Sequence, residues 1–425
     1  MLALSFARMA DALGNSLLIV ILPLYIAEQP SLWLDLPNEA QVGLVISLYG
    51  FLFAFAQPFA GILTDRAGKR KPFILAGLAL MALATLGFMF AHRYVWIVVL
   101  RCLQGLGVAM IIPSVLALIS AVTEKRTRGN AMGVYSTLRM VGFATGPLLG
   151  GFLHVTLGFN AAFLTGAAFL AVAYTLVQFT VHEREEPAES AGKEVPAGAN
   201  AAEEGEADGG PASSTTPAPD PVKRVRVSKM PTPTNLALLF STVIMASSLS
   251  MISALENEFN ERLAQTALGF GLAFSALTVA RLFVQIPLGR LSDRVGRKKL
   301  IVGGLTALAP LTVLFGYVGT TMQLVGVRLA QGVASAAIAA PAFALAADLA
   351  QKGGEGREMS FVTMGFGLGL GVGPLIAGGL GGYVSFESPF LVVGGFSLLA
   401  ALAVAVFAEE SIKPHEWSLS DDPNP

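Results

Sequence analysis

The chain has 425 residues, of which 54% are hydrophobic and only 13% are charged. Soluble domains carry about 25% charged residues, so this composition argues against a large soluble enzyme and indicates an all-α polytopic membrane protein, whose apolar runs of about 20 residues each cross the bilayer. The formal net charge of −1 provides no general attraction to nucleic acid.

The apolar runs predict twelve membrane spans in two sets of six. The first run lacks the basic leader and the small-residue cleavage site of a signal peptide, and it contains Arg8 and Asp11, so we expect a membrane helix there. The first six spans are expected near 3–27, 41–63, 72–91, 94–121, 129–152 and 158–181, and the second six near 234–257, 266–289, 299–318, 322–349, 358–382 and 387–408.

A polar segment separates the two sets. It is rich in Glu, Ala, Gly, Pro and Ser, and it has too few large apolar residues to offset the entropy of ordering. Basic residues at its end, Lys223, Arg224 and Arg226, suit contact with anionic lipid as well as they suit a topology signal. The predicted organisation is a six-helix bundle at 1–181, a disordered cytoplasmic linker at 182–233, a second bundle at 234–409 and a cytoplasmic tail at 410–425.

Lysine and arginine in the short loops predict the orientation. The loops near Arg66 and Arg294 are strongly basic, whereas the loops on the other face carry acids such as Glu28 and Asp35. Because basic loops stay in the cytoplasm, and because the number of spans is even, we expect a multi-pass protein of the cell membrane with both termini in the cytoplasm.

Three sequence blocks recur in the second half of the chain. "GILTDRAGKRK" at Gly61 is repeated as "GRLSDRVGRKK", "RCLQGLG" as "RLAQGVA", and "GPLLGG" as "GPLIAGG". The offset is 228 residues from Asp65 to Asp293 and 227 residues from Arg101 to Arg328. Two parallel six-helix repeats are an architecture of transporters, with the substrate site near the midplane between the halves.

The loop block places an acid, a base, a glycine and a basic pair in the same order in both halves. A carboxylate at a helix end can hold basic groups or another helix terminus, so the repeated order favours a cytoplasmic gate over charges that only set topology. The predicted gate residues are Gly61, Asp65, Arg66, Gly68, Arg70, Lys71, Gly289, Asp293, Arg294, Gly296, Lys298 and Lys299.

The fifth span carries glycines at fixed spacing around a proline. Residues four apart form one smooth stripe that lets another helix approach closely, and the proline removes a backbone hydrogen bond and can bend the helix. A stripe beside a bend suits a helix that moves against a partner, although tight packing alone also explains the glycines. The pattern comprises Gly133, Gly142, Gly146, Pro147, Gly150 and Gly151, and its second copy has Ser360 and Ala377 in place of two glycines.

These blocks resemble the major facilitator superfamily, and the resemblance covers nearly the whole chain outside the linker and the tail. The loop block is similar to the signature that closes the cytoplasmic side of that family. The block at Arg101 is similar to a signature associated with proton-coupled members. The glycine pattern of the fifth span resembles the antiporter signature of the drug:proton branch. The resemblance also implies a cavity lined by spans 1, 4, 7 and 10.

Ionisable side chains inside the spans are the candidates for coupling and cargo binding, because charges at membrane depth face protein or water. Arg8, Asp11 and Asn15 share one face of the first span; a coupling acid at Asp11 and a structural Arg8–Asp11 pair both remain open. Arg101 either faces a cavity or a partner, or snorkels outward, and Glu256, Glu258 and Asp348 are expected to be solvated. The proton-coupling candidates are Asp11, Arg8, Arg101 and Arg139, and the substrate-cavity candidates are Asn15, Gln104, Arg139 and Arg281.

The favoured hypothesis is a proton-coupled antiporter that exports drug-like or amphipathic small molecules. The alternatives are an exporter of a sugar or an anionic metabolite, with Arg139 or Arg281 as counter-charge, and a membrane sensor or scaffold that does not transport. The chain shows no nucleophile–base pair, phosphate loop or metal-ligand cluster, so we expect no enzymatic activity and no cofactor. We expect a monomer whose partners are protons, the cargo and membrane lipids, with no nucleic acid.

Overall fold

The computed structural model of the chain describes residues 2–29, 35–122, 128–181, 232–349 and 355–411. The expected linker at 182–233 lies almost wholly outside the described residues, together with Lys223, Arg224 and Arg226, and so does most of the tail at 410–425. All of the described helices belong to one unit.

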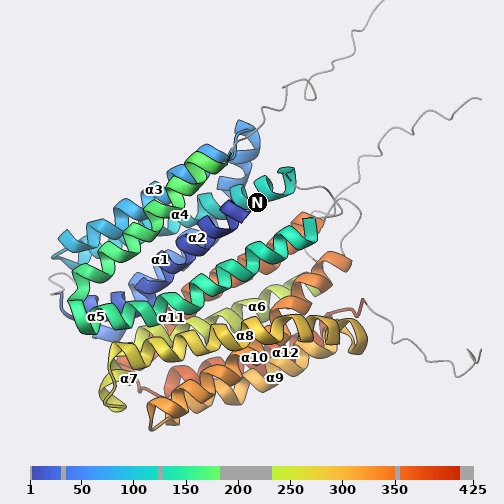
Figure 1. Ribbon diagram of the computed structural model, residues 1–425. Helices are drawn as coiled ribbons and strands as arrows, with labels where there is room; N and C mark the ends of the chain where they lie inside the picture. Colours follow the sequence, from blue (N-terminus) through green and yellow to red (C-terminus); the bar gives the residue numbers. More distant parts are fainter. Residues whose placement is uncertain (1, 30–34, 123–127, 182–231, 350–354, 412–425) are drawn as a thin grey trace, which may run out of the picture. The chain divides into compact units, whose positions relative to one another are not determined.

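Within the described ranges, all regular secondary structure is helical (Figure 1). The first half of the chain contains α1 (Leu2–Ala27), α2 (Asn38–Ala67), α3 (Lys71–Gly87), η1 (Phe88–Phe90), α4 (Tyr94–Val122) and α5 (Arg128–Thr180). The second half contains α6 (Pro233–Ser250), η3 (Met251–Leu255), α7 (Glu256–Arg262), α8 (Ala267–Val295), α9 (Arg297–Leu314), η4 (Phe315–Tyr317), α10 (Thr321–Asp348), α11 (Glu355–Tyr383) and α12 (Ser388–Phe407).

The described helices provide the membrane spans that the apolar runs predict. Eleven stretches are long and apolar enough to cross a membrane, and one of them, Gly133–Thr180, has 48 residues. A straight helix of that length would be about 70 Å long, more than twice the thickness of a bilayer core of about 30 Å. Gly158 interrupts it with a non-helical backbone (φ 82°, ψ −176°), so this stretch comprises two spans and the total is twelve.

Glycine permits the sharp turns at the ends of α2 and α8. Gly68 and Gly296 follow these helices with φ of +64° and +108°, a region that residues with a Cβ rarely occupy. The second glycine of each loop block is therefore required by the backbone. The end of the helices that carries these two loops is called the basic end below, because both loops are rich in Lys and Arg.

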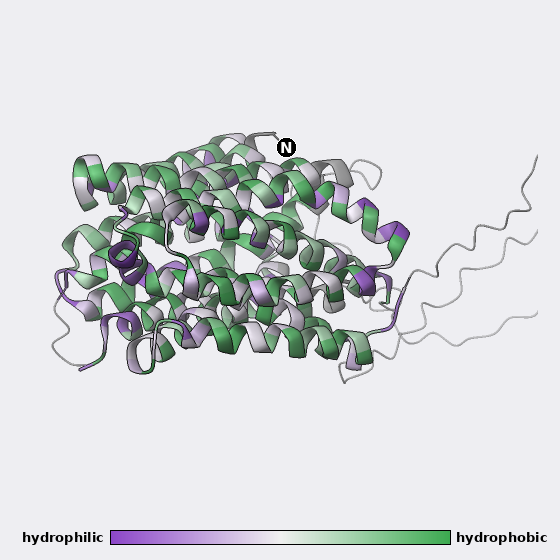
Figure 2. Cartoon of the chain, turned by 90° about the horizontal axis from the view of Figure 1, so that it is seen from below, coloured by the Kyte–Doolittle hydropathy of each residue, from purple (hydrophilic) through white to green (hydrophobic). Residues whose placement is uncertain are grey.

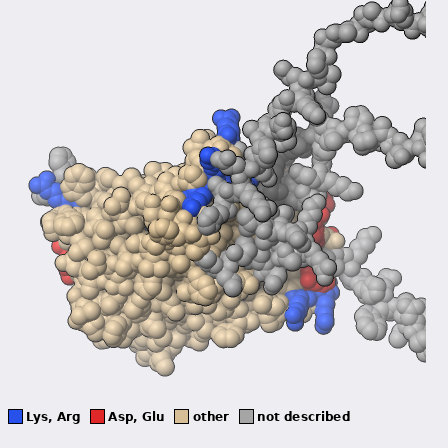
Figure 3. Space-filling view, turned by 45° about the horizontal axis from the view of Figure 1, so that its top comes forward, with Lys and Arg blue, Asp and Glu red and all other residues tan. Residues whose placement is uncertain are grey.

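The outer surface of the helices is apolar between the two ends. Hydrophobic residues follow the helices along most of their length (Figure 2). On the face shown in Figure 3, Lys, Arg, Asp and Glu lie near the ends and leave a broad band without charge between them. Large side chains such as Phe59, Phe179 and Phe283 are more than 70% exposed. Such a band matches the hydrocarbon layer of a membrane.

One cluster of the hydrophobic core joins the two halves at one end of the unit. This cluster combines first-half residues such as Ile21 and Val42 with second-half residues such as Phe259 and Phe390, and it lies at the end opposite the basic end. Nearer the basic end, a separate cluster fills each half. The two halves are therefore packed together at the opposite end.

Backbone contacts between the halves follow the same distribution. The outer portions of α2 and α11 meet through glycines, with Gly50 against Gly371 and Gly43 against Gly378. On the other side of the unit, α5 meets α8. Asn257 adds a hydrogen bond from its Nδ2 to the carbonyl oxygen of Pro23 at 3.2 Å.

Candidate functional site

Arg8 and Asp11 form a buried ion pair in α1. Arg8 Nη1 donates a hydrogen bond to Asp11 Oδ2, and the two side chains are 6% and 3% exposed. The pair adjoins a small pocket that apolar side chains of α3, α4 and α5 line, including Leu78 and Val177. Arg8 Nε and Asp11 Oδ1 have no hydrogen-bond partner. The polar face of α1 therefore contacts protein, inside the first half, and its ion pair is only partly satisfied.

Asn15 and Arg101 both contact Tyr49 of α2. Asn15 Nδ2 donates a hydrogen bond to the Tyr49 hydroxyl at 2.9 Å, and the Arg101 guanidinium lies 4.4 Å from the centre of the Tyr49 ring. Arg101 is 4% exposed, which rules out the expectation that it snorkels outward. The alternative, an arginine that faces a partner, is the arrangement in this structure.

Gln104 corrects an expectation from the sequence, which placed it in the substrate cavity. Its side chain is fully buried. Its Oε1 accepts a hydrogen bond from Arg101 Nη1 at 2.8 Å, and its Nε2 donates one to Thr85 Oγ1 at 2.9 Å. Both partners belong to the first half, so Gln104 holds α3 and α4 together.

The second half repeats this polar cluster with residues that the sequence argument did not assign to a site. Arg328 Nη1 donates to Gln331 Oε1 at 2.7 Å, and Gln331 Nε2 donates to Ser248 Oγ at 2.9 Å. Ser248 in turn shares a hydrogen bond with Thr312 Oγ1 at 2.6 Å. Thr85 and Thr312 are 227 residues apart, as are Arg101 and Arg328. That common offset was the signal in the sequence that could have identified Thr85 and Thr312.

Arg139 of α5 and Arg281 of α8 lie at similar depth on two helices that pack together from opposite halves. A Cβ added to Gly271 of α8 would collide with the carbonyl oxygen of Pro147 of α5, so these two residues mark the same level. From that level Arg139 is eight residues and Arg281 ten residues nearer the basic end. At a rise of 1.5 Å per residue these intervals are about 12 Å and about 15 Å.

Neither arginine has an acidic partner in the part of the chain that the structure describes. Both are partly exposed, the Nε of each is buried without a hydrogen bond, and each guanidinium appears in none of the described ion pairs. The charge of Arg139 acts on Arg281, and the charge of Arg8 acts on Arg139. Arg139 also stacks over Phe143, 5.0 Å from the ring centre.

The glycine stripe of α5 packs directly against α1. A Cβ on Gly142 would collide with the carbonyl oxygen of Met9, one on Gly146 with the Ser16 hydroxyl, and one on Gly150 would lie 2.7 Å from the carbonyl oxygen of Leu17. Gly151 faces the other way, and its Cβ would collide with Ala267 of α8, across the boundary between the halves. Gly133 has no neighbour within 4 Å.

The incomplete second copy of the stripe makes the same contacts. A Cβ on Gly369 or Gly373 of α11 would collide with backbone carbonyl oxygens of α6. Ser16 Oγ donates to the carbonyl oxygen of Gly142 at 3.2 Å, and Ser250 Oγ donates to that of Gly369 at the same distance. Close helix packing therefore explains the stripe in both halves, and Ser360 lies among residues whose side chains are not described.

The two loop blocks differ in the contacts that their predicted gate residues make. Gly61 and Gly289 make no tight approach to another helix. In the second half, Arg297 lies 3.6 Å from Asp293 and 2.5 Å from Asp348, so Asp348 is paired and not simply solvated. Glu410 Oε1 accepts a hydrogen bond from the Arg297 amide at 2.9 Å.

The basic residues of the first loop block lie around the start of α3. Lys71 Nζ donates to the carbonyl oxygen of Gln178 at 2.6 Å. The Asp65 side chain is outside the described residues. Among the other predicted gate residues, Arg66, Arg70, Arg294 and Lys299 sit at or beside the helix ends and Lys298 donates its amide to Glu410 Oε2 at 3.1 Å.

Glu256 contradicts the expectation of a solvated carboxylate. Its side chain is fully buried at the start of α7. Asn260 is close enough to act on the carboxyl group, yet both carboxyl oxygens lack a completed hydrogen bond. The adjacent Asn257 makes the contact between the halves described above, so Glu256 lies where the opposite end is closed.

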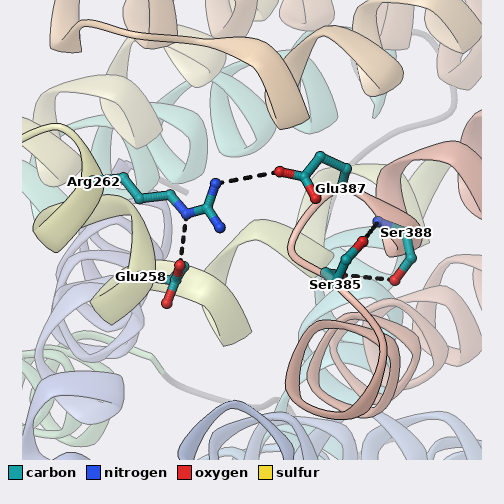
Figure 4. Close-up of polar contacts among 5 residues, drawn as sticks. All are labelled: Glu258, Arg262, Ser385, Glu387 and Ser388. Carbon is teal, nitrogen blue, oxygen red and sulfur yellow. Dashed lines mark hydrogen bonds and ion pairs between the residues drawn. The ribbon is translucent and has the colours of Figure 1, made fainter.

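Glu258, in contrast, belongs to an exposed cluster around Arg262 (Figure 4). Arg262 Nε lies 2.6 Å from Glu258 Oε1, and Arg262 Nη1 lies 3.3 Å from Glu387 Oε1. The guanidinium also lies 4.0 Å from the centre of the Phe386 ring. The pKa of Glu387 is lowered, first by a hydrogen bond from its own backbone amide and then by Ser385 and Arg262. This cluster joins the end of the seventh span to the loop before α12.

The chain has twelve spans in two repeated halves that are joined at one end, and ionisable side chains lie at membrane depth. These features define a secondary transporter. The family profile described as Major Facilitator Superfamily matches residues 4–255 and 234–423. The chain therefore belongs to the Major Facilitator Superfamily, and it is a transporter and not an enzyme.

The relatives of the chain include proteins named as drug efflux pumps. A multi-drug resistance efflux pump PmrA homolog of Lactococcus lactis is 27% identical, over 88% of this chain and 86% of that protein. The multidrug resistance protein MdtG of Escherichia coli is 26% identical, over 91% of this chain and 89% of its own length.

Solved structures share the fold. A bacterial homolog of the human lysosomal transporter Spinster, in an inward-facing and occupied conformation, matches with a TM-score of 0.71 and 17% identity over 95% of both chains. The nucleoside transporter NupG matches with a TM-score of 0.67 and 15% identity, over 96% of this chain and 99% of that one.

Proposed function

We propose that this transporter is a proton-coupled antiporter that exports amphipathic, drug-like compounds by alternating access. The observation that carries the proposal is the buried Arg8–Asp11 pair. Asp11 lies nine residues, or about 14 Å, along α1. An acid at that depth can bind a proton in one conformation and release it in the other. Arg8, Arg101 and Arg139 assist this binding and release of the proton, because their positive charges set the electrostatic field around the first-half helices.

The proposed class of cargo rests on the similarity of the chain to named efflux pumps and on the packing of α5 against α1. The relatives in Lactococcus lactis and Escherichia coli are named as multidrug efflux pumps. The stripe of Gly142, Gly146 and Gly150 resembles the antiporter signature, and it gives α5 a smooth surface that contacts α1 along about two turns. A helix with such a surface can shift against its partner without losing its contact.

The alternating movement involves the two six-helix halves, 1–181 and 234–409. With the basic end in the cytoplasm, as the positive-inside rule requires, the shared hydrophobic cluster closes the external side, and both termini lie in the cytoplasm. The described conformation then opens toward the cytoplasm. The loops at Gly68 and Gly296 would close that side in the other conformation.

The second candidate, export of an anionic metabolite, is favoured by one observation: among the described residues, Arg139 and Arg281 have no acidic partner. A sensor or scaffold has no comparable support, because the loop glycines keep the backbone that the gate requires.

Proton flux in proteoliposomes tests the proposal. Vesicles with an acidic interior and trapped pyranine are exposed to a panel of amphipathic compounds that includes tetraphenylphosphonium and taurocholate. The proposal predicts that at least one compound raises the interior pH only when the protein is present. If no compound in a broad panel moves protons, the antiporter assignment is wrong.

A further inference from the structure

The interior between α5 and α8 carries more positive than negative charge. Arg139 is near enough to Arg8 and to Arg281 for its charge to interact with each of theirs, and Arg8 is the one of the three with an acidic partner among the described residues, Asp11. Charges at membrane depth are costly unless they are paired or hydrated. Arg139 and Arg281 therefore leave two positive charges without a counter-ion from the described protein.

The positions of these two arginines define a site and not an isolated charge. They extend from different halves, and both lie nearer the basic end than the level at which Pro147 meets Gly271. Their depths differ by about 3 Å at a helical rise of 1.5 Å per residue. They lie on the basic-end side of the cluster that joins the halves. Phe143 lies beside Arg139 and supplies an apolar surface next to the charge.

From this arrangement we infer that the cargo is an amphipathic anion, whose carboxylate, sulfonate or phosphate group binds between Arg139 and Arg281 while its apolar body contacts neighbouring side chains such as Phe143. Guanidinium groups bind such oxyanions through charge-assisted hydrogen bonds, often in a bidentate geometry. This inference rests on the proposed export function and names the class of its substrate.

The site also gives the anion a role in the conformational change. Like charges on α5 and α8 repel each other and oppose closure of the halves at the basic end. An anion that contacts both arginines removes that repulsion and favours closure, because a ligand shifts an equilibrium toward the conformation to which it binds more tightly. A cation in the same place would add to the repulsion.

Counterflow in proteoliposomes without a pH gradient tests the inference separately from proton coupling. Radiolabelled taurocholate serves as the amphipathic anion and radiolabelled tetraphenylphosphonium as the amphipathic cation. We expect taurocholate counterflow in the wild type, and a loss of about tenfold or more in Arg139→Gln and in Arg281→Gln, the range expected when a charged hydrogen-bond partner is removed. Arg139→Lys and Arg281→Lys should restore part of the rate.

Arg290→Gln is the matched control, because it removes the same charge from an exposed position of α8. It should leave taurocholate counterflow within about twofold of the wild type, since exposed surface substitutions have small effects. Size-exclusion chromatography establishes that the variants are folded.

Two results would overturn the inference while leaving the export function in place. One is counterflow of tetraphenylphosphonium without counterflow of taurocholate. The other is taurocholate counterflow that both glutamine variants retain. Absence of counterflow for both probes contradicts the inference and the export function together. Taurocholate counterflow without proton flux supports the inference and contradicts proton coupling.

Discussion

Arg328 in α10 occupies the position that Arg101 occupies in α4. Each Nη1 donates a hydrogen bond to the glutamine three residues later, at 2.7 Å in the second half and 2.8 Å in the first. Each guanidinium also lies over an aromatic ring, Phe274 for Arg328 and Tyr49 for Arg101. The arginine therefore holds helices together inside each half, although the proposed coupling acid, Asp11, belongs to the first half.

The first prediction concerns the glutamines of this repeated cluster. Gln331→Leu removes an acceptor from a fully buried arginine and leaves Ser248 without its donor. We expect a loss of about 2–4 kcal/mol in the free energy of unfolding, because a buried charged donor would lose a partner. Gln104→Leu should act in the same direction. Thermal unfolding in detergent, followed by circular dichroism, measures the change.

Gln178→Leu provides the comparison for this experiment, since its side chain is exposed on α5. It should change stability by less than about 0.5 kcal/mol. A Gln331→Leu protein that is as stable as the Gln178→Leu protein would show that the cluster contributes little.

The second prediction separates packing glycines from the rest of the signature. Gly142→Ala and Gly369→Ala each place a Cβ against a backbone carbonyl oxygen, so the helices must move apart, at a cost of about 1–3 kcal/mol. We expect both variants to lose stability and transport rate. Gly133→Ala meets no neighbour and should instead gain up to about 1 kcal/mol from helix propensity.

Counterflow and thermal unfolding of the three glycine variants provide the measurement. Equal losses in Gly133→Ala and Gly142→Ala would mean that the signature is required for something other than helix contact. A harmless Gly369→Ala would mean that the two stripes are not equivalent.

The third prediction is a pH dependence of the cluster around Arg262. Hydrogen bonds and the Arg262 charge lower the pKa of Glu387 in the folded protein below its ordinary value of 4.5. The charged carboxylate therefore stabilises the folded state above that ordinary value, and this contribution is lost as the pH falls through the lowered pKa. Because the group is exposed, the effect should be well under 1 kcal/mol.

Unfolding temperatures of the wild type and Glu387→Gln test this dependence. The wild type should be more stable than the variant at pH 7, and the difference should shrink between pH 5 and pH 3 and at high salt. A difference that grows as the pH falls has the wrong sign for this account.

Much of the fold follows from the sequence, because each span must be long, apolar and helical to cross a bilayer. The twelve spans are predicted for this reason, and the repeat is predicted from the recurring sequence blocks. The seventh span was placed too short, since η3 and α7 continue it to Arg262. Glu256 lies near the end of the predicted span and was expected to be solvated, and only the packing of the opposite end buries it.

The polar contacts were harder to predict, because hydropathy does not indicate which neighbour a helix face meets. Asp11 is three residues from Arg8, so their pairing could be anticipated. Gln104 lies only three residues from Arg101, yet its partner Thr85 belongs to another helix. The level shared by Arg139 and Arg281 depends on the contact between α5 and α8, which neither helix encodes alone.

The central claim is that Asp11 couples proton movement to export, and one measurement tests it most directly. Cargo-dependent proton flux and counterflow are compared in proteoliposomes of the wild type, Asp11→Asn and, as an exposed acid control, Glu258→Gln. We predict that Asp11→Asn keeps counterflow but loses proton flux by at least about tenfold, whereas Glu258→Gln keeps both. Wild-type proton flux in Asp11→Asn would contradict the claim.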